Sequence, residues 1–372
     1  MDTVELVDTV VVGAGQAGLV TARELAERGR DCVVLDRAAR VGDGWRHHYD
    51  SLRLYTPGRH TSLPGLPFPG DPDTCPGKDE LADYLETYAE HFRLPVRTRT
   101  SVARVGRAAD GSDGFDVTTG GGTIRCRNVV VATGGFGRAP ALPGFAADLD
   151  PSILQLHSSE YRRPGQLRDG PVLVVGASHS GCDIAHEVAA THETHLAGRD
   201  CGQLPLRWEG VRAPRAFPLV LFAWNHVMTR RTPIGRRMMP HVRDHGGPML
   251  RVKREHLADR GVVRHTQRVE SVTGGRPTLA DGTVLDVATV VWATGYQQRF
   301  DWLDLPVVGD DGWPREYRGV AADVPGLYFC GLAFQYSFAS MVLPGVGRDA
   351  RYVAEHLVAH RPVRVGERAA AA

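Results

Sequence analysis

The stretch that decides the fold of this chain is Thr9-Val-Val-Val-Gly-Ala-Gly-Gln-Ala-Gly-Leu-Val20. A run of β-branched residues ends in closely spaced glycines, and a helical pattern follows from Leu19 to Arg28, so the sequence predicts a strand, a tight turn and a helix. In such a unit the first glycine permits the turn, the second lets the backbone approach a pyrophosphate, and the third lets the helix pack closely on the strand. The N–H groups at the helix N-terminus can then bind the anion.

The next predicted strand extends the same unit from Cys32 to Asp36. Asp36 follows Gly13 by 23 residues, and a carboxylate at this position accepts hydrogen bonds from a ribose diol. The first unit is therefore predicted to bind a dinucleotide with Gly13, Gly15, Gly18 and Asp36.

The same pattern returns 163 residues later in Val172-Leu-Val-Val-Gly-Ala-Ser-His-Ser-Gly181. Ser178 replaces the middle glycine of the first unit, and Arg199 replaces its acid. Because an arginine here suits a 2′-phosphate, the second unit is predicted to bind NADP rather than NAD. A unit that keeps the fold but has lost the nucleotide is an alternative, since Ser178 restricts the approach of the backbone.

Each unit also has a late strand that ends at Ala-Thr-Gly, over Asn128–Gly134 and Thr289–Gly295. Small residues at the carboxyl end of a parallel strand leave room for a dinucleotide and for the chain to pass between domains. The sequence therefore predicts an α/β protein with two Rossmann-like, doubly wound dinucleotide-binding domains.

The composition excludes several other classes of protein. The 372 residues are enough for two domains, and 44 basic against 43 acidic side chains leave a net charge of +1, so we expect neither nucleic-acid binding nor peripheral membrane contact. The six cysteines form no C-x-x-C pair, which disfavours a redox-active disulfide and a structural zinc. Without a signal-peptide pattern or an apolar run of roughly 20 residues, the chain is expected to be a soluble cytoplasmic protein.

Several further motifs accompany the two glycine turns: Gly42-Asp-Gly-Trp45, LRLYTPGRHTSLPGLPFP at residues 52–69, VVVATG at 129–134, VVWATGY at 290–296, and GLYFCG and LPGVGRDA near the C-terminus. With GAGQAG and GASHSG, they make the chain resemble the flavin-containing monooxygenases, a family of flavoproteins with two dinucleotide-binding domains, over residues 8–360. The compact, YUCCA-like end of that family is the better comparison, because no substrate domain is appended. The resemblance implies an NADP domain inserted in an FAD domain.

The implied limits of the domains follow these motifs. Residues 1–160 and 298–361 would form the two parts of the FAD-binding domain, and residues 161–297 the NADP-binding domain, with an inserted helical segment at about 201–260. Residues 362–372 are expected to be a disordered tail.

The resemblance also implies which residues bind the cofactors FAD and NADPH. FAD would contact Gly13, Gly15, Gln16, Ala17, Gly18, Asp36, Arg37, Gly44, Trp45, Leu52, Thr56, Val102, Ala132, Thr133, Gly134, Gly331 and Leu343. NADPH would contact Gly176, Ser178, His179, Ser180, Gly181, Arg199, Ala293, Thr294 and Gly295. Tyr55 and Gln335 are candidate catalytic residues, since each could present a polar group to the flavin or to the substrate.

Two other features bear on the site. The stretch Leu343-Pro-Gly-Val-Gly347 is predicted to precede an amphipathic helix from Arg348 to His360, whose N-terminal dipole would stabilise negative charge on a reduced flavin. No metal is expected, because the histidines near the motifs form no ligand pair of metal-binding spacing: His47, His48, His60, His157 and His179.

These features favour an FAD-dependent monooxygenase. It would use NADPH to reduce the flavin, form a flavin C4a-peroxide with molecular oxygen and oxygenate a small heteroatom-bearing, carbonyl or 2-oxo-acid substrate. The site residues would exclude water and orient the cofactors, so no catalytic triad or carboxylate pair is required. Two alternatives stay open: an NADPH-dependent flavoprotein reductase or dehydrogenase without oxygen insertion, and a non-catalytic nucleotide-binding protein. A homodimer is also left open.

Overall fold

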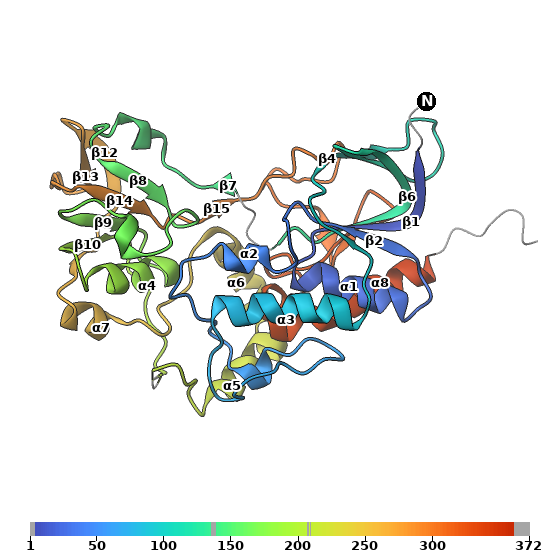
Figure 1. Ribbon diagram of the computed structural model, residues 1–372, viewed down its shortest axis with the longest axis horizontal. Helices are drawn as coiled ribbons and strands as arrows, with labels where there is room; N and C mark the ends of the chain where they lie inside the picture. Colours follow the sequence, from blue (N-terminus) through green and yellow to red (C-terminus); the bar gives the residue numbers. More distant parts are fainter. Residues whose placement is uncertain (1–3, 135–138, 207, 209, 361–372) are drawn as a thin grey trace, which may run out of the picture.

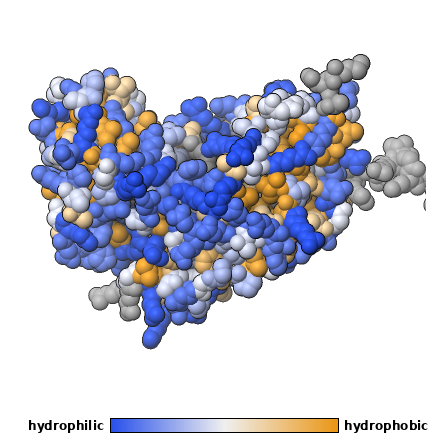
Figure 2. Space-filling model, in the orientation of Figure 1, coloured by the Kyte–Doolittle hydropathy of each residue, from blue (hydrophilic) through white to orange (hydrophobic). Residues whose placement is uncertain are grey.

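The computed structural model describes residues 4–134, 139–206, 208 and 210–360. The expected tail at residues 362–372 lies outside the described residues. Two lobes are visible in Figure 1, each built on a sheet with helices packed against it. The two lobes together give the surface a notched outline, and the middle of the face drawn in Figure 2 is largely hydrophilic.

The larger sheet carries the first glycine turn. Its strands run in the order β16 (Glu316–Tyr317), β17 (Val320–Ala321), β18 (Leu327–Phe329), β6 (Gly122–Val131), β1 (Glu5–Val12), β2 (Cys32–Leu35) and β3 (Val96–Arg97), with β4 (Val102–Arg107) and β5 (Phe115–Thr119) forming an antiparallel extension of β6. Strand β1 pairs in parallel with β2 and β6, and β18 pairs in parallel with β6. The carboxyl ends of these strands therefore meet at one edge, where α/β sheets bind ligands.

The central strand β1 is buried on both faces. Val10 and Val12 pack on one face with Phe115, and Val11 packs on the other with Leu19. Strands of this kind are continuous apolar runs rather than alternating ones, which explains the repeated valines of the motif. The face that contains Val11 is covered by α1 (Gln16–Ala26), α3 (Lys78–His91) and α8 (Leu343–Ala359) (Figure 1).

The smaller sheet is parallel throughout and carries the second glycine turn. Its order is β11 (Val263–His265), β10 (Thr194–Ala197), β9 (Val172–Val175), β14 (Thr289–Trp292) and β8 (Leu154–His157). Helices α4 (His179–Val188) and α7 (Arg254–Asp259) and the hairpin β12 (Val269–Thr273) and β13 (Arg276–Leu279) complete this lobe. The predicted α/β class with two Rossmann-like units is therefore confirmed. The sheet begins before the expected domain limit at residue 161, because β8 pairs with β14.

The chain crosses between the lobes at two places that lie side by side. β7 (Ala139–Pro140) leads into the smaller sheet, β15 (Tyr296–Gln297) leads out of it, and the two pair antiparallel. Thr294 strengthens this crossing, because its hydroxyl donates to the carbonyl oxygen of Ala141 at 2.5 Å. The two lobes are thus joined by a short two-stranded ladder.

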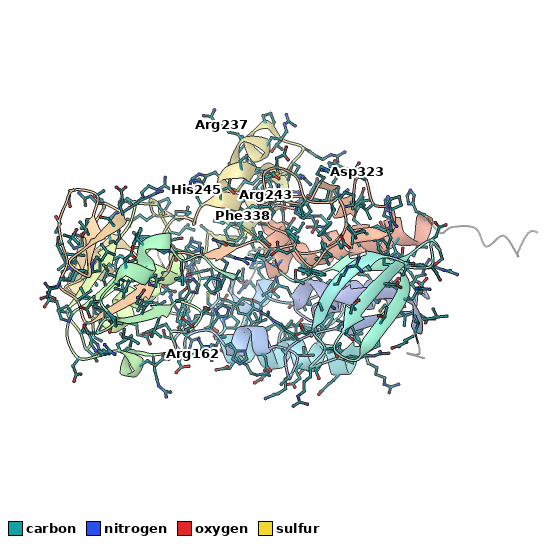
Figure 3. The ribbon with its side chains drawn as sticks, turned by 90° about the horizontal axis from the view of Figure 1, so that it is seen from above. Arg162, Arg237, Arg243, His245, Asp323 and Phe338 are labelled. Atoms are coloured by element: carbon teal, nitrogen blue, oxygen red, sulfur yellow. The ribbon has the colours of Figure 1, made fainter. Side chains whose placement is uncertain are left out.

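The inserted segment between β10 and β11 is helical, with α5 (Phe217–Phe222), a π-helical turn (Ala223–Val227) and α6 (Pro233–Asp244) preceding α7. Helices α2 (Asp43–Arg46) and α6 lie between the lobes (Figure 1), and His245 follows α6 on the side of the smaller lobe (Figure 3). Glu316 attaches the inserted segment to the larger lobe, since its carboxylate lies 2.8 Å from Arg230, which precedes α6, and 3.6 Å from Arg243 of α6. Short 3₁₀ turns lie at Gly58–His60, Gly144–Asp148, Pro164–Gln166 and Phe338–Met341.

Helix starts differ from the sequence predictions. Helices α1 and α4 begin directly at the glycine turns, with extended Gly15 and Ser178 as their N-caps. The prediction that the C-terminal helix begins at Arg348 is wrong, because α8 begins at Leu343. Pro344 is compatible with this start, since the first N–H groups of a helix have no intrahelical partner.

Within the described ranges, every helix is too short or too polar to span a lipid bilayer.

Candidate functional site

The first glycine turn joins β1 to α1 with little free space. Gly13 has a φ of +107°, and a Cβ atom on it would lie 2.6 Å from the carbonyl oxygen of Ala132. A Cβ atom on Gly18 would lie 1.8 Å from the carbonyl oxygen of Gly13. These two glycines are therefore required by the packing of strand and helix. Gly15 differs, because a Cβ atom there would have no described atom within 4 Å apart from its chain neighbours.

Asp36 closes this turn from the end of β2. Its carboxylate accepts hydrogen bonds from the N–H groups of Ala14 at 2.6 Å and Ala38 at 2.8 Å. At the start of α1, the side-chain oxygen of Gln16 is buried and has no hydrogen-bond partner in the described part of the chain. Buried polar atoms are normally paired, so the open Gly15 and the unpaired Gln16 oxygen together suit a polar ligand at this turn.

The carboxyl ends of β6 and β18 meet the start of α1. Residues 132–134 directly follow β6, and Gly134 is open with a φ of +107°. Gly331 follows β18, and a Cβ atom on it would lie 2.7 Å from the Cβ of Ala17. Leu343 begins α8 and packs in the same core as Ala17. The structure therefore gathers these predicted residues around the first turn.

The remaining predicted FAD contacts lie farther along the larger lobe. Gly44 and Trp45 lie in α2, and Arg37 follows β2 with its side chain exposed. Thr56 is buried, and its hydroxyl oxygen lies 3.3 Å from that of Thr61. Val102 begins β4 and pairs with Thr119 of β5, while the N–H of Thr100, two residues earlier, donates to the carbonyl oxygen of Asp36 at 2.8 Å. Leu52 instead packs against the core of the smaller sheet.

The second glycine turn repeats the packing of the first. Gly176 has a φ of +112°, and a Cβ atom on it would lie 2.3 Å from the carbonyl oxygen of Ala293. A Cβ atom on Gly181 would lie 1.7 Å from the carbonyl oxygen of Gly176. The duplication seen in the sequence is therefore also a duplication of backbone geometry.

The second turn is covered in a way that the first is not. The segment Gly246–Pro248, here called the covering segment, lies against the side chains of Ser178 and His179. The Ser178 hydroxyl donates to the carbonyl oxygen of Gly247 at 2.9 Å, and Nε2 of His179 lies 2.7 Å from that of Pro248. A Cβ atom on Gly246 would lie 2.5 Å from the Ser178 side chain, so the contact needs glycine there. No motif in the sequence predicts this contact, because Ser178 and Gly247 lie 69 residues apart.

Arg199 lies beyond the end of β10, where the first unit has its acid. It is exposed and has no ion-pair partner among the described residues, whereas the neighbouring Asp200 lies 3.4 Å from Arg264 and also pairs with Arg254. Arg199 is therefore free to bind an anion. Thr294 and Gly295, by contrast, contact the chain crossing, because the Thr294 hydroxyl donates to the carbonyl oxygen of Ala141 and the N–H of Ala141 donates to the carbonyl oxygen of Gly295 at 3.0 Å.

Tyr55 lies at the junction of the lobes rather than in an open cavity. Its hydroxyl donates to Oδ2 of Asp183 at 3.3 Å, and its ring centroid lies 5.0 Å from that of His179. Burial, together with the Asp183 carboxylate, raises the pKa of Tyr55 well above its ordinary value, so the phenol stays protonated. Burial lowers the pKa of His179 and favours its neutral form.

Asp183 is the residue that sequence analysis missed. Oδ2 of this buried carboxylate also accepts the hydroxyl of Tyr49 at 3.2 Å and lies 3.1 Å from Nη2 of Arg251. The signal in the sequence was its spacing, because Asp183 follows His179 by four residues and so shares its helix face.

Gln335, the second catalytic candidate, is fully buried in the larger lobe. Its side-chain oxygen accepts the N–H of Leu332 at 3.3 Å, and its side-chain nitrogen has no partner in the part of the chain that the structure describes. A Cβ atom on Gly319 would lie 2.4 Å from that nitrogen. Gln335 therefore points into the protein beneath the β16–β17 hairpin.

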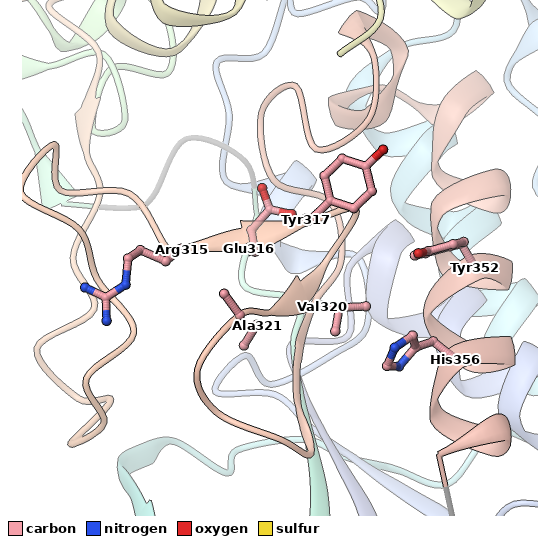
Figure 4. A pocket seen from close by; sticks show the side chains of 8 residues that line it. Arg315, Glu316, Tyr317, Val320, Ala321, Tyr352 and His356 are labelled. Atoms are coloured by element: carbon pink, nitrogen blue, oxygen red, sulfur yellow. The ribbon is translucent and has the colours of Figure 1, made fainter. Parts of the chain in front are cut away.

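Two surface pockets lie away from both turns. One, of about 470 Å³, lies between the β16–β17 hairpin and α8, with Tyr317, Tyr352 and His356 in its wall (Figure 4). The other, of about 610 Å³, is lined by residues 103–104 and 301–306. Neither contains a predicted site residue. Across the described ranges, no group of three His, Cys, Asp or Glu side chains is arranged to hold a metal.

Comparisons with known proteins agree with this geometry. Residues 10–203 match the model of the pyridine nucleotide-disulphide oxidoreductase family. An uncharacterized CzcO-like oxidoreductase of Geobacillus kaustophilus is 37% identical over 358 residues, which cover 95% of this chain and 99% of that protein. A mutant flavin monooxygenase from Stenotrophomonas maltophilia has a similar structure, with a TM-score of 0.77 and 27% identity over 96% of this chain and 99% of that one. The probable indole-3-pyruvate monooxygenase YUCCA1 of Arabidopsis thaliana is 29% identical over 82% of this chain and 80% of its own length.

The two matched glycine turns and these similarities define a flavoprotein oxidoreductase, and the resemblance to flavin-containing monooxygenases is confirmed. The chain belongs to the pyridine nucleotide-disulphide oxidoreductase family and, at 37% identity over nearly its whole length, is a CzcO-like oxidoreductase.

Proposed function

We propose that this protein is an FAD-dependent monooxygenase that uses NADPH and oxygenates a small heteroatom-bearing, carbonyl or 2-oxo-acid substrate. We assign FAD to the larger lobe and NADPH to the smaller one. The observation that carries the proposal is the second glycine turn, which repeats the packing of the first. Where the first turn has Asp36, the second has Arg199, which is exposed and forms no ion pair with any residue that the structure describes. The similarity to flavin and indole-3-pyruvate monooxygenases supports oxygen insertion.

The residues at the first turn fit FAD. Gly15 is open, the Gln16 side-chain oxygen lacks a partner among the described residues, and Asp36 keeps lone pairs for a ribose diol. The N-terminus of α1 would bind the pyrophosphate through its free N–H groups. When bound, FAD accepts hydride from a nicotinamide and, once reduced, reacts with oxygen.

The second turn fits NADPH through its backbone and through Arg199. Gly176 and Gly181 keep the N-terminus of α4 close to β9, so its N–H groups can face a pyrophosphate. The Arg199 guanidinium suits a 2′-phosphate, because it offers several donors in one plane. The hydrogen bond between Ser178 and the covering segment would restrict access to this turn.

The cysteines argue against reduction of a disulfide by this chain. All six are free, and burial raises the pKa of every thiol, to about 12 for Cys126, Cys182 and Cys330 and to about 11 for Cys32. Since the thiolate is the nucleophile in thiol–disulfide exchange, none of these groups is activated for that reaction.

The test measures reduction of the flavin by NADPH or NADH and the transfer of an oxygen atom to a product. The purified protein is mixed anaerobically with NADPH or NADH while the flavin absorbance is recorded, and isotopically labelled oxygen is then admitted with a panel of candidate substrates. Bleaching by NADPH followed by labelled product supports the proposal. Bleaching without labelled product for any substrate would favour the reductase. Bound FAD that NADPH does not bleach would favour a non-catalytic nucleotide-binding protein.

A further inference from the structure

A single carboxylate oxygen joins three separate parts of the chain. Oδ2 of Asp183 accepts hydrogen bonds from Tyr49 at 3.2 Å and Tyr55 at 3.3 Å, and it lies 3.1 Å from Nη2 of Arg251. The two tyrosines lie between α2 and the 3₁₀ turn at Gly58–His60, Asp183 lies in α4, and Arg251 lies in the inserted segment. The side chain of Tyr49 packs in the core of the smaller sheet, whereas Leu54, which precedes Tyr55, packs in the core of the larger sheet. The Asp183 side chain is only 4% exposed, so water does not replace these partners.

The same three parts also meet at the second glycine turn. The Tyr55 ring packs on His179, and His179 in turn contacts Pro248 of the covering segment. Along α4 and its N-cap, Ser178 contacts Gly247, His179 contacts Pro248, and Asp183 contacts Arg251. The inserted segment therefore runs along the N-terminal half of α4, and the ion pair at Asp183 ends this row of contacts.

The network lies at the helix whose N-terminus would hold the second dinucleotide. The β7–β15 ladder joins the lobes at their chain crossings, but it consists of only two residue pairs. Because so short a ladder does not by itself prevent rotation of one lobe against the other, side-chain contacts between the lobes must restrain that rotation. Asp183 supplies such a contact from α4 to Tyr55, whose neighbour Leu54 packs in the core of the larger lobe.

We propose that Asp183 is a positioning residue that fixes α4 against the larger lobe and so sets the distance between the two bound cofactors. This proposal rests on the proposed function, which has FAD at α1 and NADPH at α4. Loss of the network should therefore slow hydride transfer from NADPH to the flavin more than it weakens the binding of NADPH. A displacement of about 1 Å between reacting groups can cost roughly a hundredfold in rate. Asp183 itself needs no contact with either cofactor.

The variants separate the roles of the negative charge of Asp183, its acceptor oxygen and the Tyr55 hydroxyl. Asp183→Ala removes the acceptor and leaves buried polar partners, whereas Asp183→Asn is nearly isosteric, keeps an acceptor oxygen for the tyrosines and loses the charge opposite Arg251. Tyr55→Phe removes one donor. The matched control is Asp116→Asn, which breaks a buried carboxylate–arginine contact of 2.8 Å to Arg125 within the larger lobe. If Asp183→Ala does not fold, Asp183→Asn and Tyr55→Phe still test the proposal.

The first readout is kinetic. We expect Asp183→Ala to retain FAD and to bind NADP⁺ within about threefold of the parent by calorimetry, while the limiting rate of flavin reduction at saturating NADPH falls at least tenfold. In the Asp183→Ala background, Tyr55→Phe should add little, because the two residues act as one unit. An unchanged limiting rate in Asp183→Ala and Asp183→Asn, with only weaker NADP⁺ binding or lower stability, would overturn the proposal.

The second readout needs no turnover. Hydrogen exchange of the apoprotein should increase in residues 49–56 and 246–251 together in the Asp183 variants, and not in Asp116→Asn. If the parent protein is not reduced by NADPH, the proposed function fails while this measurement still tests the junction. Unchanged exchange in both segments would refute the junction even if the parent enzyme is active.

Discussion

The carbonyl oxygen of Gly13 lies 1.8 Å from the position that a Cβ atom on Gly18 would occupy. Gly176 and Gly181 repeat this relationship at 1.7 Å in the second lobe. Such a distance is far shorter than any contact between a carbonyl oxygen and a methyl group. The third glycine of each motif is therefore required by the packing of strand and helix, whereas the middle glycine of the first motif, Gly15, is open.

This division predicts opposite results for two substitutions in the first turn. Gly18→Ala should lower the free energy of unfolding by at least about 1–3 kcal/mol, because its Cβ must push strand and helix apart. Gly15→Val should leave stability nearly unchanged and abolish FAD retention, because its side chain fills the open position. Urea unfolding and the flavin absorbance of the purified variants measure the two effects. A Gly15→Val protein that stays yellow would contradict the assignment of FAD to this turn.

Arg199 should decide between NADPH and NADH. Replacing it with alanine removes a charge-assisted contact of about 1.5–3 kcal/mol, so we expect the KM for NADPH to rise roughly ten- to hundredfold, with little change for NADH. Arg276→Ala, an exposed arginine of the β12–β13 hairpin that pairs with Asp286 at 3.0 Å, is the control. Equal effects on both nucleotides in Arg199→Ala would remove this residue from phosphate recognition.

Ser178 should limit access to the second turn. Ser178→Ala removes the 2.9 Å hydrogen bond to Gly247, and Ser178→Gly also removes the Cβ atom. We expect both to lower the Kd for NADP⁺, about three- to tenfold for the hydrogen bond alone, with the glycine variant binding more tightly. Calorimetric titration of the two variants and the parent protein provides the measurement. Weaker binding in both variants would mean that the covering segment helps to hold the nucleotide instead.

Asp116 should make stability depend on acid pH. Its hydrogen-bonded ion pair with Arg125 lowers the pKa of Asp116 below the value of about 3.9 for an unfolded chain. Between the two pKa values, the unfolded state therefore binds more protons than the folded state. The ion pair stabilises the fold fully above about pH 4, and this stabilisation is lost as the pH falls through the lower, folded-state pKa of Asp116. The difference in unfolding free energy between the parent and Asp116→Asn should shrink from pH 7 to pH 3. A difference that does not depend on pH would contradict this assignment.

Much of the fold was predictable because its signals are local. The valines of β1, the glycines of both turns and the acid or arginine after the next strand lie within single strand–turn–helix units, where spacing alone dictates geometry. The 163-residue offset between Gly13 and Gly176 revealed the duplication without any knowledge of contacts. The start of α8 was misjudged by five residues, because Leu343-Pro-Gly contains residues that usually interrupt helices but are accepted in a first turn.

The sequence by itself therefore determined the two glycine turns and their order, and it predicted a dinucleotide for each. Only the tertiary structure decided how the turns are covered and joined. Tyr49 lies 134 residues from Asp183, and Ser178 lies 69 residues from Gly247. Contacts over such separations leave no periodic pattern, because they depend on how two separate sheets and an inserted segment pack. The buried Asp183 network exists only after that packing has removed its partners from water.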